Sequence, residues 1–313
     1  MSLHVFGNIV TPFGTAANNR GDNEGSNITP LQKLIWHGAP HTTVSAEAIR
    51  FSLRRLLAES EATGGGTNRS WDEDARVNTW KDHEFKGWAA KNGKTFIDDD
   101  LLGFMRADAA KEEAGEKKGS ANVRRAVLEI TRAVSLTAWS GDVTFNAASP
   151  GATPSASKGD DNKSKNPVPY GTEVHATRYQ FGFAMTPARL RDPSRAAKAI
   201  SAIGSLRTVA GNHGRFLFDF SPEAIVLRIT DDPAPRLLYC FDTRDGGRTV
   251  TAKSLIARIK SGDIAKGELI IGIADTDSPL ATSLIEAGLT VQGVRAAVTA
   301  ASQRIATEVS ATA

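Results

Sequence analysis

Amide and guanidinium side chains gather in a polar stretch near the start of the chain. The run Asn18-Asn19-Arg20-Gly21 combines two amide groups, a guanidinium and a glycine turn. Groups of this kind hold phosphate and sugar oxygens. The surrounding residues 11–44 are rich in Asn, Gly, Thr and Pro, and a loop of that length in a compact domain is either functional or disordered. We interpret this stretch as functional.

A helix is predicted directly after the polar stretch, over residues 44–61. Thr42, Thr43 and Ser45 are candidate N-caps, and Glu47 is placed for a capping box. The start of this helix therefore presents free N–H groups and a positive dipole end toward whatever the loop holds.

The same helix carries a polar strip suited to an anion. Ser45, Arg50 and Arg54 lie close enough on the helical surface to work together. The opposite side is the apolar face, made of Ile49, Leu53, Leu56 and Leu57.

Two histidines lie in turns next to predicted strands. His41 precedes the start of the helix, and His213 lies in a second glycine-rich turn between Asn212 and a glycine followed by Arg215. Two turns rich in Asn, His and Arg favour contacts with a polyanion backbone. The alternative for each histidine is a loop residue that hydrogen-bonds to the backbone.

Basic residues are also in excess between positions 178 and 215. The net charge is only +3 and the sequence pI about 9.0, which is too mild to indicate nucleic acid. Locally, seven basic residues face one acid, Asp192, and such an excess predicts either a phosphate-facing surface or a solvated helix face. The seven are Arg178, Arg189, Arg191, Arg195, Lys198, Arg207 and Arg215.

Composition places the chain among globular proteins of a reducing compartment. With 313 residues and 40% hydrophobic content it can build a real core. No run of apolar residues is long enough for a membrane span, and no signal peptide is recognised. Cys240, the single cysteine, lies in an apolar run and is predicted to be buried. We expect a cytoplasmic protein.

Motifs of common enzymes are missing from the sequence. It contains no P-loop, no Gly-x-Ser-x-Gly and no His-Glu-x-x-His. The run Asp98-Asp99-Asp100 and the pair Asp275 and Asp277 are able to bind Mg²⁺ in principle. Both are more simply explained as N-terminal caps of the helices that follow. We expect no catalytic residue, no metal and no cofactor.

The order of elements predicts an α+β fold. A strand over 3–10 and the helix over 44–61 come first, and a mostly helical block follows, with a helix over 120–136. A hairpin with a low-complexity, mobile tip over 146–169 is next, then a helix from Pro193 to about Val209. Three apolar runs, RFLFDF, AIVLRI and RLLYCF, predict an antiparallel meander. The last predicted elements are helices at 250–261, 279–287 and 290–309 and a strand at 268–274.

Three segments resemble a known family. GNIVTPFGTAANNRGDNEGSNITPLQKLIWHGAPHTTVSAEAIRFSLRR is similar to the N-terminal signature of the DevR-type (Cst-type) backbone subunit of type I-B CRISPR Cascade complexes, a RAMP-superfamily protein. AGNHGRFLFDFSPEAIVLRITDDPAPRLLYCF and EVHATRYQFGFAM resemble two further blocks of that family. Residues 62–172 match by position only.

The resemblance implies a ferredoxin-like (RRM-type) palm with a helical fingers insertion and a protruding β-hairpin thumb. The palm would comprise residues 1–61 and 174–313, the fingers 62–142 and the thumb 143–173. Copies of such a subunit stack head to tail along a crRNA, assemble with other Cascade subunits, and present the guide for pairing with target DNA.

The resemblance also implies site residues. The family contacts the guide backbone through the loop after the first strand, the first helix and the glycine-rich turn before the meander, and the thumb reaches a neighbouring copy. Here the corresponding RNA-binding residues are Asn18, Asn19, Arg20, His41, Ser45, Arg50, Arg54, Asn212, His213 and Arg215, and the thumb residues are Tyr170, His175 and Arg178.

Two other functions remain open from the sequence. One is a RAMP-type endoribonuclease that processes guide RNA, with His41 or His213 as general acid and base. The other is a scaffold that binds proteins only.

Overall fold

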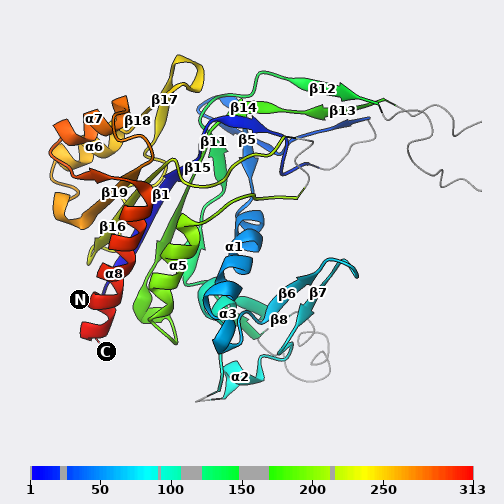
Figure 1. The fold of residues 1–313 in the computed structure, drawn as a ribbon, viewed down its shortest axis with the longest axis vertical. Coiled ribbons are helices and arrows are strands. Elements are labelled where there is room, and N and C mark those ends of the chain that lie inside the picture. The colour runs from blue at the N-terminus through cyan, green and yellow to red at the C-terminus, as the bar shows by residue number, and fades with distance from the viewer. Residues whose placement is uncertain are drawn as a thin grey trace, which may run out of the picture.

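A nine-stranded sheet organises the computed structural model, which describes residues 2–21, 27–90, 93–106, 122–147, 169–211 and 216–312 (Figure 1). The fold is α+β, as predicted. The spatial order is β20-β19-β16-β1-β15-β11-β5-β4, with β10 also paired to β15. Its strands are β1 (His4–Val10), β4 (Lys33–Trp36), β5 (Ala39–Val44), β10 (Leu128–Ile130), β11 (Ala133–Ser135), β15 (Tyr179–Met185), β16 (Ala224–Thr230), β19 (Leu269–Ile273) and β20 (Val291–Gln292).

The central strand β1 is apolar on both sides because helices cover both faces of the sheet. Successive side chains of a strand alternate between faces. Val5 and Ile9 accordingly join one buried cluster, and Phe6 and Val10 join another.

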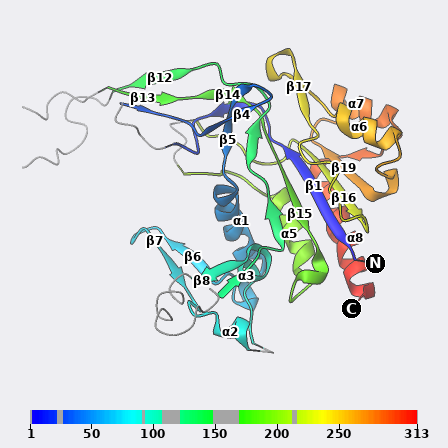
Figure 2. The ribbon, with the colours of Figure 1, turned by 180° about the vertical axis from the view of Figure 1, so that it is seen from behind.

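The first cluster lies under α1 (Ala46–Ser60), α3 (Ile97–Leu102), α5 (Arg195–Gly204) and α8 (Val294–Thr312). The second lies under α6 (Lys253–Lys260) and α7 (Pro279–Glu286). Figure 1 shows α5 and α8 side by side across the sheet, and Figure 2 shows β1 and β15 from behind. These six helices include all those predicted outside the block 62–142.

The polar stretch over 11–44 is not one loop. It contains the short strands β2 (Gly14–Ala16) and β3 (Ile28–Thr29) and the hairpin β4–β5. That hairpin turns at His37 and Gly38, whose positive φ angles of 49° and 82° suit a tight two-residue turn.

The block over 62–142 is not mostly helical. Its described residues form only two short α-helices, α2 (Lys86–Ala89) and α3, and a one-turn 3₁₀ helix, η1 (Ala62–Gly64). The other elements are strands: β6 (Arg69–Asp72), β7 (Val77–Trp80), β8 (Phe104–Arg106) and β9 (Asn122–Arg124), followed by β10 and β11. The predicted helix over 120–136 is wrong: Leu128 and Ile130 are buried while Glu129 between them is half-buried, a period of two that suits a strand.

A hairpin at the predicted place projects from the body in both views (Figures 1 and 2). It pairs β12 (Val143–Asn146) with β13 (Tyr170–Glu173) in antiparallel register, and β3 joins β13 in parallel. Residues 148–168, most of the predicted mobile tip, lie outside the described residues. The base of the hairpin continues into β14 (His175–Thr177), which pairs with β2.

The predicted meander is wrong. Only its middle run forms a strand, β16, which pairs with β1 and β19 and not with the runs on either side. The outer runs are buried but irregular. In the last one, Arg236 and Tyr239 adopt φ angles of 56° and 55°, which an extended strand does not allow.

Short elements complete the described chain: η2 (Pro187–Arg189), β17 (Asp242–Arg244), η3 (Asp245–Gly247), β18 (Thr249–Thr251) and η4 (Lys266–Glu268). Cys240 is buried, as predicted. Within the described residues, no helix has the length and apolar character needed to cross a membrane.

Candidate nucleic-acid interface

The start of α1 and the loop after β1 are joined by a network of polar contacts. Ser45 is the N-cap, and its Oγ accepts a hydrogen bond from Ala48 N at 3.2 Å. The backbone N and the Oγ of Ser45 both donate to Asn19 Oδ1 at 3.4 Å. Asn19 Nδ2 donates to the Thr43 carbonyl at 2.7 Å. The amide of Asn19 thus fixes the loop against the positive end of the helix.

An arginine that sequence reasoning missed extends this network. Arg132 lies between β10 and β11, and its Nη1 donates to Gln32 Oε1 and Thr43 Oγ1, each at 3.1 Å. Among the described residues, Arg132 has no carboxylate partner. It was missed because it fell within the wrongly predicted helix. We call Asn19, Gln32, Thr43, Ser45 and Arg132 the loop–helix cluster.

Arg50 lies in the next turn of α1. Its Nε is buried, and the described residues offer it no hydrogen bond or ion pair. The residue as a whole is half-buried, and an oxyanion is the partner that a guanidinium fits best. Arg54, on the same face, is different: its Nε donates to Asp98 Oδ2 at 3.2 Å.

Arg20 lies at the edge of this region. It is half-buried, and its backbone forms an antiparallel bridge with Leu31. Gln32 Nε2 donates to the Arg20 carbonyl at 3.4 Å, and this hydrogen bond connects Arg20 to the loop–helix cluster. The structure therefore brings together Asn19, Arg20 and Ser45, three of the predicted residues.

Three predicted site residues have their side chains inside the protein instead. Asn18 is fully buried, and its Nδ2 donates to the Val209 carbonyl at 2.8 Å. His41 is buried with its Nδ1 2.6 Å from the Ser135 carbonyl oxygen, which matches the backbone-bonded alternative. These two side chains stabilise the loop from within.

His175 is the third predicted site residue whose side chain lies inside the protein. It is buried between hydroxyl groups, with Nδ1 2.7 Å from Thr42 Oγ1 and Nε2 3.2 Å from Thr137 Oγ1. Burial lowers the pKa of His175 to about 4, so the ring is neutral near pH 7. It lies on β14 at the base of the hairpin, and not on β12 or β13.

The hairpin residues differ in exposure. Tyr170 is exposed on β13, and Phe145 is exposed on β12 one position away in the cross-strand register. Arg178 is mostly buried, where it pairs with Glu223 at 2.9 Å and lies over the ring of Phe13. Of the three predicted thumb residues, only Tyr170 is exposed.

The basic excess over 178–215 is largely neutralised by acids from distant parts of the chain. Arg195 pairs with Glu61 and Asp100, both at 3.1 Å, and Lys198 pairs with Glu61 at 2.8 Å. Arg191 lies over the Trp88 ring, 4.0 Å from its centroid. The predicted phosphate-facing surface is therefore mainly a set of structural ion pairs. Asn212, His213 and Arg215 lie outside the described residues.

The three consecutive aspartates of α3 all accept hydrogen bonds from other parts of the chain. Asp98 accepts from the backbone N of Asn68 at 2.7 Å, Asp99 accepts from Asn68 Nδ2 at 2.9 Å, and Asp100 accepts from Arg124 Nη2 at 2.8 Å. Burial, and then the charge of Asp98, raise the pKa of Asp99 to about 7. These carboxylates connect α1, the β6–β7 hairpin and α5, and they do not cap their own helix.

The pair Asp275 and Asp277 does not cap a helix either. Ser278 is the N-cap of α7, whereas Asp275 Oδ1 accepts from the backbone N of Asp277 at 3.0 Å. The described residues contain no group of three or more His, Cys, Asp and Glu arranged for a metal ion.

Comparison with solved structures shows that this fold is a known one. The whole fold is similar to chains of two solved assemblies named CRISPR RNA-guided surveillance complex. One, described as pre-nicking, has a TM-score of 0.55 at 15% identity, covering 95% of this chain and 100% of that chain. The other has a TM-score of 0.53 at 16% identity, covering 96% and 100%.

Sequence comparison then gives the family. Residues 13–234 match the model of the CRISPR-associated negative auto-regulator DevR/Csa2 family. A CRISPR-associated protein Cas7/Cst2/DevR of Myxococcus xanthus (strain DK1622) is 60% identical over 273 residues, which is 87% of each chain. The chain therefore belongs to the DevR/Csa2 family, as its sequence signature predicts.

Proposed function

We propose that the protein is a non-catalytic crRNA-binding backbone subunit of a type I-B CRISPR Cascade surveillance complex. In this role it polymerises along the guide through sequence-independent backbone contacts and presents the guide to target DNA in antiviral defence. It does so in the cytoplasm, together with other Cascade subunits.

The observation that carries this proposal is the surface around the start of α1. The capped helix start, the Asn19 amide, and two arginines without a carboxylate partner among the described residues, Arg50 and Arg132, favour an oxyanion. Contacts to phosphate and sugar oxygens carry no sequence information, so a site of this kind would be blind to sequence.

The topology supports a ferredoxin-like palm. Strands β1, β11, β15 and β16, taken in chain order with α1 after β1 and α5 after β15, follow the β-α-β-β-α-β sequence. Their spatial order in the sheet is β16-β1-β15-β11. The projecting β12–β13 hairpin, with Phe145 and Tyr170 exposed, is the natural candidate for a thumb that reaches a neighbouring copy.

The described residues give no support to the ribonuclease alternative. His41 is buried and hydrogen-bonded to a backbone carbonyl, so it lacks the access that a general acid or base needs. Incubation of the pure protein with precursor guide RNA distinguishes the two functions, since site-specific cleavage would contradict the proposal.

The direct test is to purify the complex by size exclusion, extract the bound nucleic acid and sequence it. We expect a large assembly that contains repeat-derived guides with many different spacers. A monomer free of RNA would contradict the proposal. The residue assignment is tested separately by an Arg20→Ala/Arg50→Ala double variant, which should lose assembly and RNA protection.

A further inference from the structure

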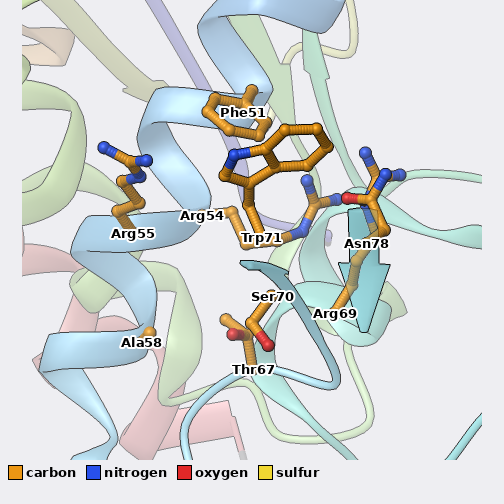
Figure 3. Close-up of a pocket in the computed structure, with 9 residues that line it drawn as sticks. All are labelled: Phe51, Arg54, Arg55, Ala58, Thr67, Arg69, Ser70, Trp71 and Asn78. Atoms are coloured by element: carbon orange, nitrogen blue, oxygen red, sulfur yellow. Dashed lines mark hydrogen bonds between the residues drawn. The ribbon is translucent and has the colours of Figure 1, made fainter. Parts of the chain in front are cut away.

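A second basic feature lies farther along α1, away from the loop–helix cluster. A pocket of about 130 Å³ opens between this helix and the β6–β7 hairpin. Figure 3 shows two aromatic rings at one end, hydroxyl groups at the other and guanidinium groups on its sides. The residues that line it are Phe51, Arg54, Arg55, Ala58, Thr67, Arg69, Ser70, Trp71 and Asn78.

The aromatic end is held in place but open to solvent. The rings of Phe51 and Trp71 meet edge to face, with centroids 6.2 Å apart and an interplanar angle of 75°. Trp71 Nε1 donates to Glu73 Oε2 at 3.2 Å, which fixes the indole. Trp71 nevertheless remains 36% exposed, so part of its ring is available to a flat ligand.

The sides of the pocket carry excess positive charge. Three arginines are balanced by two carboxylates, since Arg54 pairs with Asp98 and Arg55 with Glu73. Arg69 Nε donates to the neutral Asn78 Oδ1 at 2.9 Å. Burial, and then the nearby charge of Arg54, lower the pKa of Arg69, and the charge of Asp98 opposes this shift.

Arg55 also lines an adjoining hollow of about 240 Å³, together with Arg207 and Glu59, which pair with each other at 4.0 Å. The excess of positive charge therefore belongs to the first pocket. A ligand that fits this pocket has a flat ring for the aromatic end and an anionic group next to it. A nucleotide has this chemistry, and aromatic rings with neighbouring arginines are the usual platform for single-stranded nucleic acid.

We infer that this pocket holds one unstacked base of a nucleic-acid strand against Trp71 and Phe51, with the adjacent phosphate on Arg55. The ligand class rests on the proposed function, but the contact is separate from the backbone contacts at the loop–helix cluster. The base comes either from the guide RNA or from the target DNA strand, and one experiment distinguishes the two.

The experiment uses the assembled, guide-loaded complex and photo-crosslinking. One arm carries 5-iodouridine at successive positions of the guide, and the other carries 5-iododeoxyuridine at successive positions of the target strand. After irradiation, crosslinked peptides are identified by mass spectrometry. We expect a crosslink to Trp71 or Phe51 in one arm, confined to nucleotide positions that recur at a regular spacing.

Matched variants test the contribution of each group. Trp71→Ala should lower the affinity for the crosslinked strand about tenfold, the usual scale for loss of one stacked base. Val77→Ala is the control, because Val77 lies on the same hairpin with 49% exposure and does not line the pocket. Arg55→Gln should lower the crosslink yield, whereas Arg76→Gln in the hairpin turn should not.

Crosslinks to the loop–helix cluster without any to Trp71 or Phe51 would overturn the pocket inference and leave the proposed function intact. Contact of Trp71 with another protein subunit, without any crosslink to a base, would overturn the pocket inference in the same way. A complex that holds no nucleic acid would overturn both.

Discussion

Replacement of Arg195 by Gln tests whether the basic excess of its region is structural. The side chain is 7% exposed, with Nε 3.1 Å from Glu61 Oε1, Nη2 3.2 Å from Glu61 Oε2 and Nη1 3.1 Å from Asp100 Oδ2. Its loss leaves two buried carboxylates without their shared cation. Breaking a buried pair from one side costs about 3–5 kcal/mol of unfolding free energy.

We expect a value near the lower limit, because other cations remain. Glu61 keeps Lys198, and Asp100 keeps Arg124. A loss of about 3 kcal/mol corresponds to a fall in Tm of roughly 4–5 °C for a chain of 313 residues.

The loss should also depend on pH. Burial opposes ionisation of Glu61, but hydrogen bonds and charge from Arg195 and Lys198 bring its pKa below the ordinary value. A group with a depressed pKa stabilises the fold above its unfolded pKa and loses that contribution as the pH falls. The difference between wild type and Arg195→Gln should therefore be larger at about pH 7 than at about pH 4.

Urea unfolding followed by circular dichroism measures both quantities. Arg207→Gln is the matched control, because Arg207 lies in the same basic region with its side chain 74% exposed, and we expect its unfolding free energy to change by less than about 0.5 kcal/mol. A loss below about 1 kcal/mol for Arg195→Gln would refute the view that this charge is structural.

Three further predictions concern stability. Because the pKa of His175 falls from 6.5 to about 4 on burial, its neutral form stabilises the fold above about pH 6.5, and we expect about 3 kcal/mol to be lost as the pH falls to 4. Thermal unfolding of His175→Gln should show a weaker acid dependence, and an unchanged profile would argue against this. The pKa of Asp99 is raised from 3.8 to about 7, so its contribution is complete below about pH 4 and lost as the pH rises through 7. Asp99→Asn, which retains an acceptor for Asn68, should have a higher Tm than the wild type at pH 8 but not at pH 4. Equal Tm values for variant and wild type at both pH values would contradict the raised pKa of Asp99. Ser45→Ala removes the N-cap of α1 and should cost about 1 kcal/mol in chemical unfolding, with Ser201→Ala on the exposed side of α5 as the control.

Local patterns in the sequence predicted much of the fold. The helices α1, α5, α6, α7 and α8 and the strands β1 and β19 follow from apolar periodicity and from turn residues. Irregular but buried segments did not follow, because an apolar run such as RLLYCF looks the same whether it forms a strand or a turn. The φ angle of Tyr239, which is set by tertiary packing, decides that case.

The candidate site was predictable only where the neighbours along the chain set its chemistry. Ser45 was predicted as the N-cap because its own neighbours mark the start of a helix, whereas Asn19 reaches it from 26 residues away, across the β4–β5 hairpin. Arg195 was misjudged because its partner Glu61 is 134 residues away, and charge counting sees only local acids. Arg132 gave no signal, because nothing in the sequence shows that its turn lies beside Thr43.

The salt dependence of RNA binding tests the central claim most directly. The protein, wild type or Arg50→Gln, is titrated with two guide RNAs of unrelated sequence over a range of salt concentrations. We expect the same affinity for both guides, and a slope of log K against log salt that is smaller by about 0.7 in the variant, as loss of one phosphate contact to a single strand requires. An unchanged slope, or a loss confined to one guide, would contradict a sequence-independent backbone contact at α1.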